Sequence, residues 1–333
     1  MNPITFNALQ AVQDENGQFR LETITNTLYD IPEGEVLIKV HYSSLNYKDA
    51  LSASGNRAVT KVYPHVPGID ASGVIEVSNA NDWHAGDKVI VTGFDFGMNT
   101  DGGFAEYVKV PAKWLVKLPQ GLSLRQSMIY GTAGFTSGLS VAALIRSGIT
   151  PDKGDIVVSG ATGGVGSVAI AILSKLGYRV LAVSSKTSAN SFLTNLGAYE
   201  VIPRAELEEQ PGKILLKPRF AAGIDTVGGQ VLASIIKSLD YGGVVTTCGM
   251  VNGGELPITV FPFILKGIQL IGIDSVELPL EHRLPVWEKL SGEWLPDNLD
   301  ELAREISLNE LPEHIKLILA GQMHGRVVVR MID

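Results

Sequence analysis

The sequence predicts an α/β chain in which a doubly wound parallel sheet follows a β-rich N-terminal lobe. Three observations lead to this prediction. Residues 155–166 join a short apolar run to a glycine-rich turn, and a segment with apolar residues at helical spacing follows. Short strand-like runs separated by turn residues fill the first 125 residues. From about residue 126 helix and strand patterns alternate, which is typical of a parallel sheet covered by helices.

The N-terminal lobe is predicted from short β-like runs, each bounded by turn residues. After a hairpin signal (Glu-Asn-Gly) at residues 15–17, such runs cover residues 36–40, 74–77, 88–91 and 102–110. The chain holds 36 glycines, and many fall between these runs. Frequent sharp turns between short strands are what a small β-barrel requires, so we expect the lobe to be one.

The glycine-rich turn Gly160-x-x-Gly163-x-x-Gly166 is predicted to bind a dinucleotide. An apolar run at residues 156–158 indicates a buried strand before the turn, and Gly177 stands where the following helix should end. Glycines in this context let the backbone approach a pyrophosphate at the start of a helix. The residues expected to contact the pyrophosphate are Thr162, Gly163, Gly164 and Val165. The alternative is a glycine-rich turn that binds nothing.

The end of the next predicted strand favours NADP(H) over NAD(H). An NAD site usually places a carboxylate about 20 residues beyond the turn, where it binds the ribose 2′-hydroxyl. This chain has Ser184, Ser185 and Lys186 there, with no carboxylate to repel a 2′-phosphate. The alternative is a polar surface turn. Arg204 could add charge or stack on adenine, although a solvated arginine fits the sequence equally well.

The remaining elements are predicted from the same periodicities. Strands are expected at residues 178–183, 200–203, 222–227, 243–249 and 268–272. Helices are expected at residues 188–197, 231–239, 283–290, 299–306 and 313–319. Residues 325–330 form a terminal strand, and we expect it to pair with the N-terminal lobe because a lone strand needs a partner.

Composition and charge exclude several functional classes. The chain has 333 residues, of which 45% are hydrophobic and 19% charged, enough for two domains with a substantial core. Its net charge of −8 argues against a nucleic acid as the main partner. No apolar run reaches the roughly 18 residues of a membrane span, and no signal-peptide pattern is present. A single cysteine, Cys248, allows no intramolecular disulfide, so we expect a cytoplasmic protein without membrane partners.

A set of motifs spread over nearly the whole chain resembles those of one enzyme family. They are SSLNYKDAL at residues 43–51, PGIDASG at 67–73, GTAGFT at 131–136, GATGGVGS at 160–167, DTVGG at 225–229, PFIL at 262–265, GIDSV at 272–276 and GR at 325–326. Together they are similar to the zinc-independent, YhdH/YhfP-type quinone oxidoreductases and acrylyl-CoA reductases of the medium-chain dehydrogenase/reductase superfamily. The resemblance implies a GroES-like β-barrel catalytic domain (1–125), a Rossmann NADP-binding domain (126–275) and a C-terminal segment (276–333) that returns to the catalytic domain. It also implies a homodimer.

The resemblance predicts a reaction without metal. Zinc alcohol dehydrogenases of this superfamily have a cysteine ligand where Asn46 stands and a histidine ligand where Ile69 stands, and neither residue here can bind Zn²⁺. We therefore expect NADPH-dependent hydride transfer to an activated C=C bond in a small-molecule substrate, either an enoyl thioester such as acryloyl-CoA or an enone. The alternative is NADPH:quinone oxidoreduction. An NADPH-binding sensor without catalysis is the alternative from another class.

Three residues of the N-terminal lobe are candidates for direct catalytic roles. Asn46 could donate hydrogen bonds to the substrate oxygen, and Tyr47 could donate a bond or a proton. The resemblance implies that Tyr47 also lies against the nicotinamide. Alternatively, Asn46 caps a short helix that has Asp49 at its third position, and the Tyr47 side chain only packs against its neighbours. Asp70 could orient Asn46 or relay a proton, or it could be a turn carboxylate held by backbone N–H groups.

Three further residues are expected near the nicotinamide by resemblance: Thr136, counted as catalytic, and Met250 and Ser275. Alternatively, the Thr136 hydroxyl bonds back to its own helix, Met250 fills the core, and Ser275 supplies a hydroxyl within a turn. In residues 100–103 the chain has Thr-Asp-Gly-Gly where acrylyl-CoA reductases of this group often have His-Trp-Gly-Gly. Asp101 would repel the phosphates of an acyl-CoA.

Overall fold

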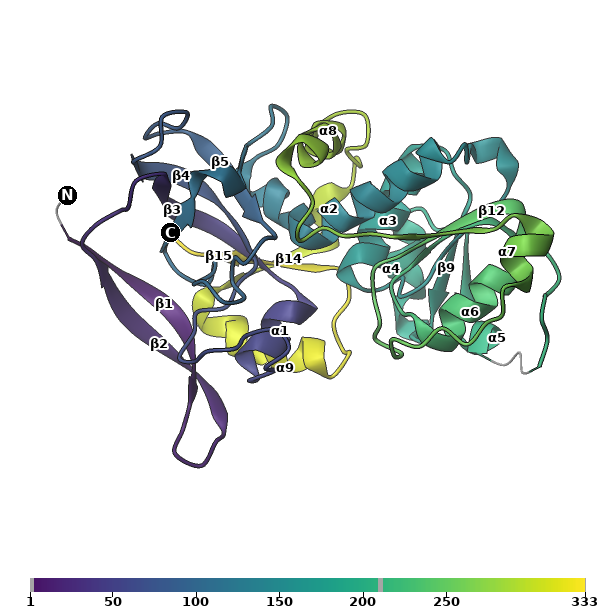
Figure 1. Cartoon of the computed structure of the whole chain (residues 1–333), viewed down its shortest axis with the longest axis horizontal. Helices are drawn as coiled ribbons and strands as arrows, with labels where there is room; N and C mark the ends of the chain where they lie inside the picture. The colour runs from purple at the N-terminus through teal and green to yellow at the C-terminus, as the bar shows by residue number, and fades with distance from the viewer. Residues whose placement is uncertain (1–2, 209–211, 333) are drawn as a thin grey trace. The chain divides into compact units, whose positions relative to one another are not determined.

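The structure is a computed structural model that describes residues 3–208 and 212–332. It contains two compact units, each built on its own sheet (Figure 1). Unit 1 comprises residues 1–132, 276–291 and 303–333, and unit 2 comprises residues 133–275 and 292–302. The domain boundaries expected from the sequence, 1–125, 126–275 and 276–333, stay a prediction.

Unit 1 contains a seven-stranded sheet in the order β14-β15-β3-β4-β5-β7, with β6 paired to β3, and a separate hairpin β1–β2. The strands are β1 (Ile4–Gln13), β2 (Phe19–Leu28), β3 (Glu35–Leu45), β4 (Asp70–Ser78), β5 (Lys88–Thr92), β6 (Tyr107–Pro111), β7 (Leu115–Lys117), β14 (Ala303–Ser307) and β15 (Arg326–Arg330). Its helices are α1 (Tyr47–Ala53), α8 (Leu280–Ser291) and α9 (Leu311–Leu319). The predicted hairpin is confirmed, whereas the strand expected at 102–110 begins only at Tyr107.

The structure of the C-terminal segment, which joins the sheet of unit 1, was predicted in part. β15 pairs antiparallel with β3, which confirms the expected partner of the terminal strand. The helix predicted at residues 299–306 is wrong, because Leu299–Leu302 forms a 3-10 turn and the following residues form β14. β14 runs parallel to β15 in a continuous register. Pairing with a strand that lies far along the chain outweighs the helical propensity of this segment.

Unit 2 contains a six-stranded parallel sheet in the order β10-β9-β8-β11-β12-β13. The strands are β8 (Ile156–Val158), β9 (Val180–Ser184), β10 (Glu200–Pro203), β11 (Phe220–Asp225), β12 (Leu239–Thr247) and β13 (Gln269–Gly272). The helices are α3 (Gly164–Lys175), α4 (Asn190–Asn195), α5 (Ala205–Glu208), α6 (Gly229–Ser238) and α7 (Phe261–Lys266). Numbered within the unit, this order is 3-2-1-4-5-6, which confirms the doubly wound dinucleotide fold.

Helix α2 (Leu124–Arg146) contains the boundary between the two units and has a kink at Gly131. By length and composition it could cross a membrane, with a mean hydropathy of 1.4 over its most apolar window, although polar residues interrupt its apolar ones. Inside the protein, 89% of that window is buried. This is the burial of a core helix, whose apolar side chains pack in the interior.

Candidate functional site

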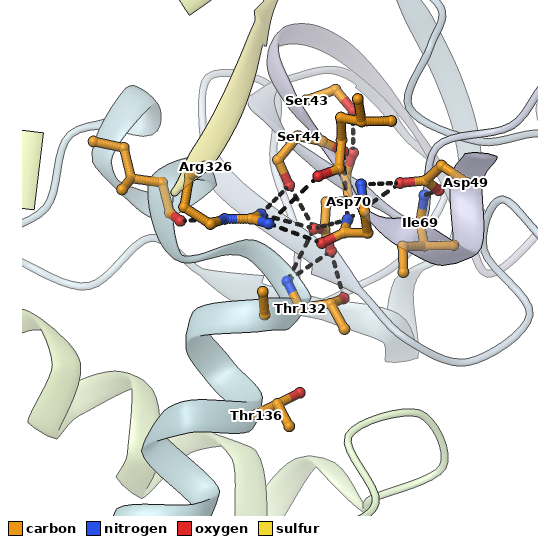
Figure 2. A network of polar contacts seen from close by, with 12 residues as sticks. Ser43, Ser44, Asp49, Ile69, Asp70, Thr132, Thr136 and Arg326 are labelled. Atoms are coloured by element: carbon orange, nitrogen blue, oxygen red, sulfur yellow. Dashed lines mark hydrogen bonds and ion pairs between the residues drawn. The ribbon is translucent and has the colours of Figure 1, made fainter. Parts of the chain in front are cut away.

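A buried polar network in unit 1 brings together residues from separate segments of the chain (Figure 2). Ser44 lies near the end of β3, Asn46 precedes α1, Asp70 begins β4, Thr132 lies in α2 and Arg326 begins β15. β4 and β15 both pair with the end of β3, and this pairing brings their first residues close to the start of α1.

Asp70 is fully buried and lies at the centre of the network. Its Oδ2 accepts hydrogen bonds from the Ser44 hydroxyl (2.6 Å) and the Asn46 amide (2.7 Å). The Thr132 N–H lies 3.0 Å and 2.9 Å from its two oxygens, and the Thr132 hydroxyl lies 2.5 Å from Oδ1. Side chains as well as backbone therefore hold this carboxylate, and it orients Asn46.

The kink in α2 is what aims the Thr132 N–H at Asp70. Gly131 has φ 50° and ψ −155°, a conformation that is strained for residues with a side chain. A Cβ at this position would collide with the Asp70 carboxylate and the Ser44 hydroxyl. Only glycine leaves room for the carboxylate against the helix, so the sequence motif GTAGFT has a structural reason at its first residue.

Asp49 is a second buried carboxylate in this region. It accepts hydrogen bonds from the backbone N–H groups of Asn46 (2.8 Å) and Ile69 (2.8 Å), and it forms a capping box with Asn46 at the start of α1. Burial, followed by the charge of Asp70, raises the pKa of Asp49 to about 7, although its hydrogen bonds oppose this rise. Asp49 therefore changes protonation near neutral pH.

Both ends of the Asn46 amide are engaged by the protein. Its oxygen accepts a hydrogen bond from Arg326 Nη1 (3.2 Å), while its nitrogen donates to Asp70 and lies 3.2 Å from Asp49 Oδ2. A primary amide has two N–H donors, and both point toward carboxylates here. Asn46 caps α1, as the alternative reading of the sequence expected, and it fixes the position from which Tyr47 starts the helix.

Arg326 is a member of the network that the sequence analysis quoted only as part of a motif. It is 3% exposed, and it donates from Nε to the Ile129 carbonyl (2.8 Å) and from Nη2 to the Ser44 hydroxyl (2.9 Å). Burial lowers the pKa of its guanidinium, and the charges of Asp70 and Asp49 oppose this effect. One signal was visible in the sequence, because an arginine at the start of an apolar terminal strand needs a buried partner.

Tyr47 differs from its neighbours because its side chain is 45% exposed. Its hydroxyl has no hydrogen-bond partner among residues 3–208 and 212–332. About half of the surface of Tyr47 is covered, so its packing role and its catalytic role both stay predictions. Within the network region Tyr47 is therefore an accessible group that can donate a hydrogen bond or a proton.

The glycine turn of unit 2 uses its glycines in two ways. A Cβ at Gly160 would collide with the Thr226 hydroxyl, and a Cβ at Gly166 would collide with the Gly160 carbonyl. A Cβ at Gly163 would approach the same carbonyl only to 3.3 Å. Gly163 is exposed at the N-cap of α3, where no side chain caps the helix. Packing requires the outer glycines, and the middle one leaves an open helix N-terminus suited to an anion.

The predicted 2′-phosphate residues lie at the ends of β9 and β10. Ser184 accepts a hydrogen bond on its hydroxyl from the Lys186 N–H (3.0 Å), and the Ser184 carbonyl accepts one from the Arg204 N–H (3.1 Å). Burial lowers the pKa of Lys186. Ser184, Ser185 and Arg204 share the lining of a pocket of about 450 Å³. The structure thus brings these three together in one pocket.

The three residues expected near the nicotinamide are placed differently from one another. Thr136 donates a hydrogen bond from its hydroxyl to the Ser275 hydroxyl (2.9 Å), and both residues are buried. Thr136 therefore does not simply bond back to its own helix. Met250 is exposed in the loop after β12, so it does not fill the core of this unit.

Asp225 is a residue of unit 2 that the sequence analysis did not select. It ends β11, is fully buried, and accepts hydrogen bonds from the hydroxyls of Ser159 (2.6 Å) and Thr247 (3.1 Å) and from the Gly228 N–H (2.9 Å). It thereby ties the carboxyl ends of neighbouring strands together. Burial raises the pKa of Cys248 to about 12, and Asp225 adds to this effect, so the thiolate is disfavoured at neutral pH.

Comparison with known proteins agrees with this architecture. The family model "Alcohol dehydrogenase GroES-like domain" matches residues 32–120, and the model "Zinc-binding dehydrogenase" matches residues 164–290. In the part of the chain that the structure describes, no group of three or more His, Cys, Asp or Glu residues could hold a metal ion. The family models therefore agree with the fold of the two units.

Three relatives are similar over most of the chain. The putative quinone oxidoreductase YhfP of Bacillus subtilis is 44% identical, covering 98% of this chain and 99% of the relative. The probable acrylyl-CoA reductase AcuI of Escherichia coli is 46% identical (90% and 92%). The acrylyl-CoA reductase AcuI of Ruegeria pomeroyi is 43% identical (97% and 98%).

Two solved structures extend this similarity to three dimensions. The crystal structure of B. subtilis yhfP with NAD bound has a TM-score of 0.95 at 44% identity and covers 98% of this chain and 99% of that one. The structure of E. coli K-12 YhdH with bound NADPH has a TM-score of 0.92 at 44% identity (98% and 100%). The chain therefore belongs to the YhdH/YhfP-type quinone oxidoreductase and acrylyl-CoA reductase family of medium-chain dehydrogenases/reductases, and it is an oxidoreductase.

Proposed function

We propose that this enzyme uses NADPH to reduce the activated C=C bond of a small enoyl thioester or enone. The observation that carries the proposal is its identity of 46% and 43% with two proteins named as acrylyl-CoA reductases, over 90% and 97% of the chain. Identity at this level over both units supports a shared reaction class, although fold alone would not.

The residues of unit 2 fit a phosphorylated dinucleotide. The uncapped start of α3 offers N–H groups to a pyrophosphate, and the exposed Gly163 lets it approach. Thr162, Gly163, Gly164 and Val165 would hold the pyrophosphate. Ser184, Ser185 and Arg204, which line one pocket, would hold the 2′-phosphate together with Lys186, which follows Ser185 in the chain but is not part of that lining. Bound there, NADPH supplies the hydride that the β-carbon of the acceptor receives.

The residues of unit 1 would act on the acceptor. Negative charge develops on its carbonyl oxygen, and a preorganised donor stabilises that charge. Tyr47 is an accessible donor, and Asn46, Asp70 and Arg326 position it by fixing the start of α1. A proton must then reach the α-carbon to complete the saturated product. Thr136, Met250 and Ser275 stay proposed contacts of the nicotinamide end.

Quinone reduction is the second candidate function. Its support is the 44% identity with YhfP, which is named a putative quinone oxidoreductase. A second observation favours it, because the Asp101 side chain is 69% exposed where its charge would oppose the phosphates of CoA.

The test is the initial rate of NADPH oxidation with acryloyl-CoA, methyl vinyl ketone and benzoquinone. The proposal predicts saturable turnover of acryloyl-CoA or of the enone, and a fall in kcat of about 10²-fold in Tyr47→Phe. The exposed Tyr29→Phe variant, also in unit 1, is the matched control and should keep wild-type rates. Turnover of the quinone alone would replace the proposal by its alternative.

We further propose that the enzyme is a cytoplasmic homodimer. The single cysteine, which allows no intramolecular disulfide, fits a reducing compartment such as the cytoplasm. α7 and the residue before it expose apolar side chains (Val260, Phe261, Ile264 and Leu265), and β13, an edge strand of the unit 2 sheet, follows directly. Ile264→Asp should halve the mass measured by sedimentation, and a monomeric wild-type protein would contradict the proposal.

A further inference from the structure

The pocket at the ends of β9 and β10 contains a carboxylate that the motif analysis did not place there. Its lining includes Ser184, Ser185 and Asn190, and its charged lining residues are Arg204 and Glu208. Glu208 ends α5, the short helix that follows β10, and this turn of chain brings its side chain back toward the strand ends. The pocket therefore holds one positive and one negative side chain.

These two side chains form an ion pair. Arg204 Nε lies 2.6 Å from Glu208 Oε1, one helical turn apart, and the two side chains are 30% and 40% exposed. An ion pair with this exposure is screened by water and is weak, so it can open when a ligand competes for either partner. A phosphate that approaches the Nε edge of Arg204 therefore competes with Glu208 for this side chain.

NADP(H) and NAD(H) would interact differently with the Arg204–Glu208 ion pair. A 2′-phosphate is attracted by the guanidinium of Arg204 and repelled by the carboxylate of Glu208. An unphosphorylated ribose can instead donate its 2′-hydroxyl to a carboxylate, which is the usual arrangement in NAD sites. The preference for NADPH that the Ser-Ser-Lys run predicts is therefore opposed within the same pocket.

We propose that Glu208 is a specificity-determining residue that narrows the preference for NADP(H) over NAD(H), because it competes with the 2′-phosphate for Arg204 and accepts a hydrogen bond from an unphosphorylated ribose. This inference rests on the proposed function in one respect, since it requires the adenosine end of the cofactor to bind at this pocket.

Three variants separate this role from a general effect on the helix. Glu208→Gln removes the charge and keeps the shape, and Arg204→Gln removes the partner. Glu206→Gln is the matched control, because Glu206 lies on the same helix but pairs with Arg219 (2.8 Å) outside the pocket. The two Glu→Gln replacements retain side-chain length and shape, whereas Arg204→Gln also shortens the side chain. The comparison of Glu208→Gln with Glu206→Gln therefore isolates the effect of the charge.

The experiment is calorimetric titration of the whole protein with 2′,5′-ADP and with 5′-AMP, which differ by the 2′-phosphate and lack the nicotinamide. We expect the ratio of the affinity for 2′,5′-ADP to the affinity for 5′-AMP to rise about fivefold in Glu208→Gln and to fall about tenfold in Arg204→Gln. The ratio should stay unchanged in Glu206→Gln. The Glu208 effect should also shrink at high salt, because it acts through partly exposed charges.

Two results would overturn the inference while leaving the proposed function intact. One is an equal change in both affinities in Glu208→Gln, and the other is the same shift in Glu206→Gln. If the wild-type protein binds neither nucleotide, the inference and the assignment of the cofactor site fail together. Because these titrations need no substrate, their outcome is independent of which acceptor the enzyme reduces.

Discussion

The polar network around Asp70 in unit 1 and the glycine turn of unit 2 are arranged in opposite ways. In unit 1, Asp70, Asn46 and Arg326 are buried and hydrogen-bonded to one another. In unit 2, Gly163 is exposed, and the helix behind it begins without a side-chain cap. A saturated network fixes geometry, whereas unsatisfied N–H groups at a helix start invite an anion. The first region positions a reacting group, and the second binds a ligand.

This difference has consequences for mutations. Removing one partner of a buried charge pair costs about 3–5 kcal/mol because the other charge is left without compensation. An exposed pair such as Arg204–Glu208 contributes about 0–1 kcal/mol. Substitutions in the unit 1 network should therefore reduce stability, and substitutions at the open surface of unit 2 should change ligand affinity.

The largest expected effect is that of Asp70→Ala. It leaves the Arg326 guanidinium, the Ser44 hydroxyl and the Thr132 groups facing an empty site, so we expect a loss of about 3–5 kcal/mol in the free energy of unfolding. Urea denaturation measures this loss. The exposed Asp101→Ala should change stability by less than about 0.5 kcal/mol. Equal midpoints for the two variants would show that the network does not stabilise the fold.

Gly131→Ala should have the next largest effect. Its backbone conformation and the collision of the new Cβ with Asp70 together should cost about 3 kcal/mol. Gly148 also has a positive φ (78°), but nothing lies within 4 Å of its added Cβ. Gly148→Ala should therefore cost only about 1 kcal/mol. If both alanine variants melt at the same temperature, crowding at the kink is unimportant.

Asp49 should make the stability of the folded protein depend on pH. Its pKa is about 7 in the folded protein and 3.8 in its ordinary state. Between these values the folded protein binds more protons than the unfolded chain, so its stability falls as the pH rises through this window. Asp49→Asn should flatten the decline of the melting temperature between pH 5 and about pH 8. The exposed Asp82→Asn is the control and should follow the wild-type curve.

The smallest expected change in stability belongs to the glycine turn. Gly163→Ala should cost less than about 1 kcal/mol, because its φ of −77° suits alanine, but it should weaken NADP⁺ binding about tenfold. Gly166→Ala should reduce both stability and binding, since its Cβ would collide with the Gly160 carbonyl. Thermal melts and calorimetric titrations of both variants check this. A loss of stability in Gly163→Ala equal to that in Gly166→Ala would contradict the distinction.

Local patterns predicted much of unit 2 and less of unit 1. The strands predicted at residues 156–158 and 200–203 match β8 and β10 residue for residue. β8 is a fully buried, short apolar run between turns, whereas β10 is an edge strand in which only Ile202 is buried. The error at residues 299–306 has the opposite cause. β14 is a strand only because β15 lies beside it, and no window of the sequence contains both partners.

The site was predicted where motifs are local and missed where contacts are distant. Asn46, Tyr47 and Asp70 stand in recognisable motifs, but the side chain that donates to the Asn46 amide oxygen is Arg326, which lies at the other end of the chain. Glu208 was missed for a similar reason. The absence of a carboxylate after β9 was visible in the sequence, whereas the turn that returns one to the pocket through α5 was not.

The most direct test of the proposed reaction is to follow the transferred hydrogen. Incubation with NADPH deuterated at its reactive C4 position, together with acryloyl-CoA or a small enone, should give a saturated product carrying one deuterium on its β-carbon, detected by mass spectrometry and NMR. Tyr47→Phe should form the same product more slowly. Consumption of NADPH with quinones alone, and no deuterated product from either C=C acceptor, would contradict the account.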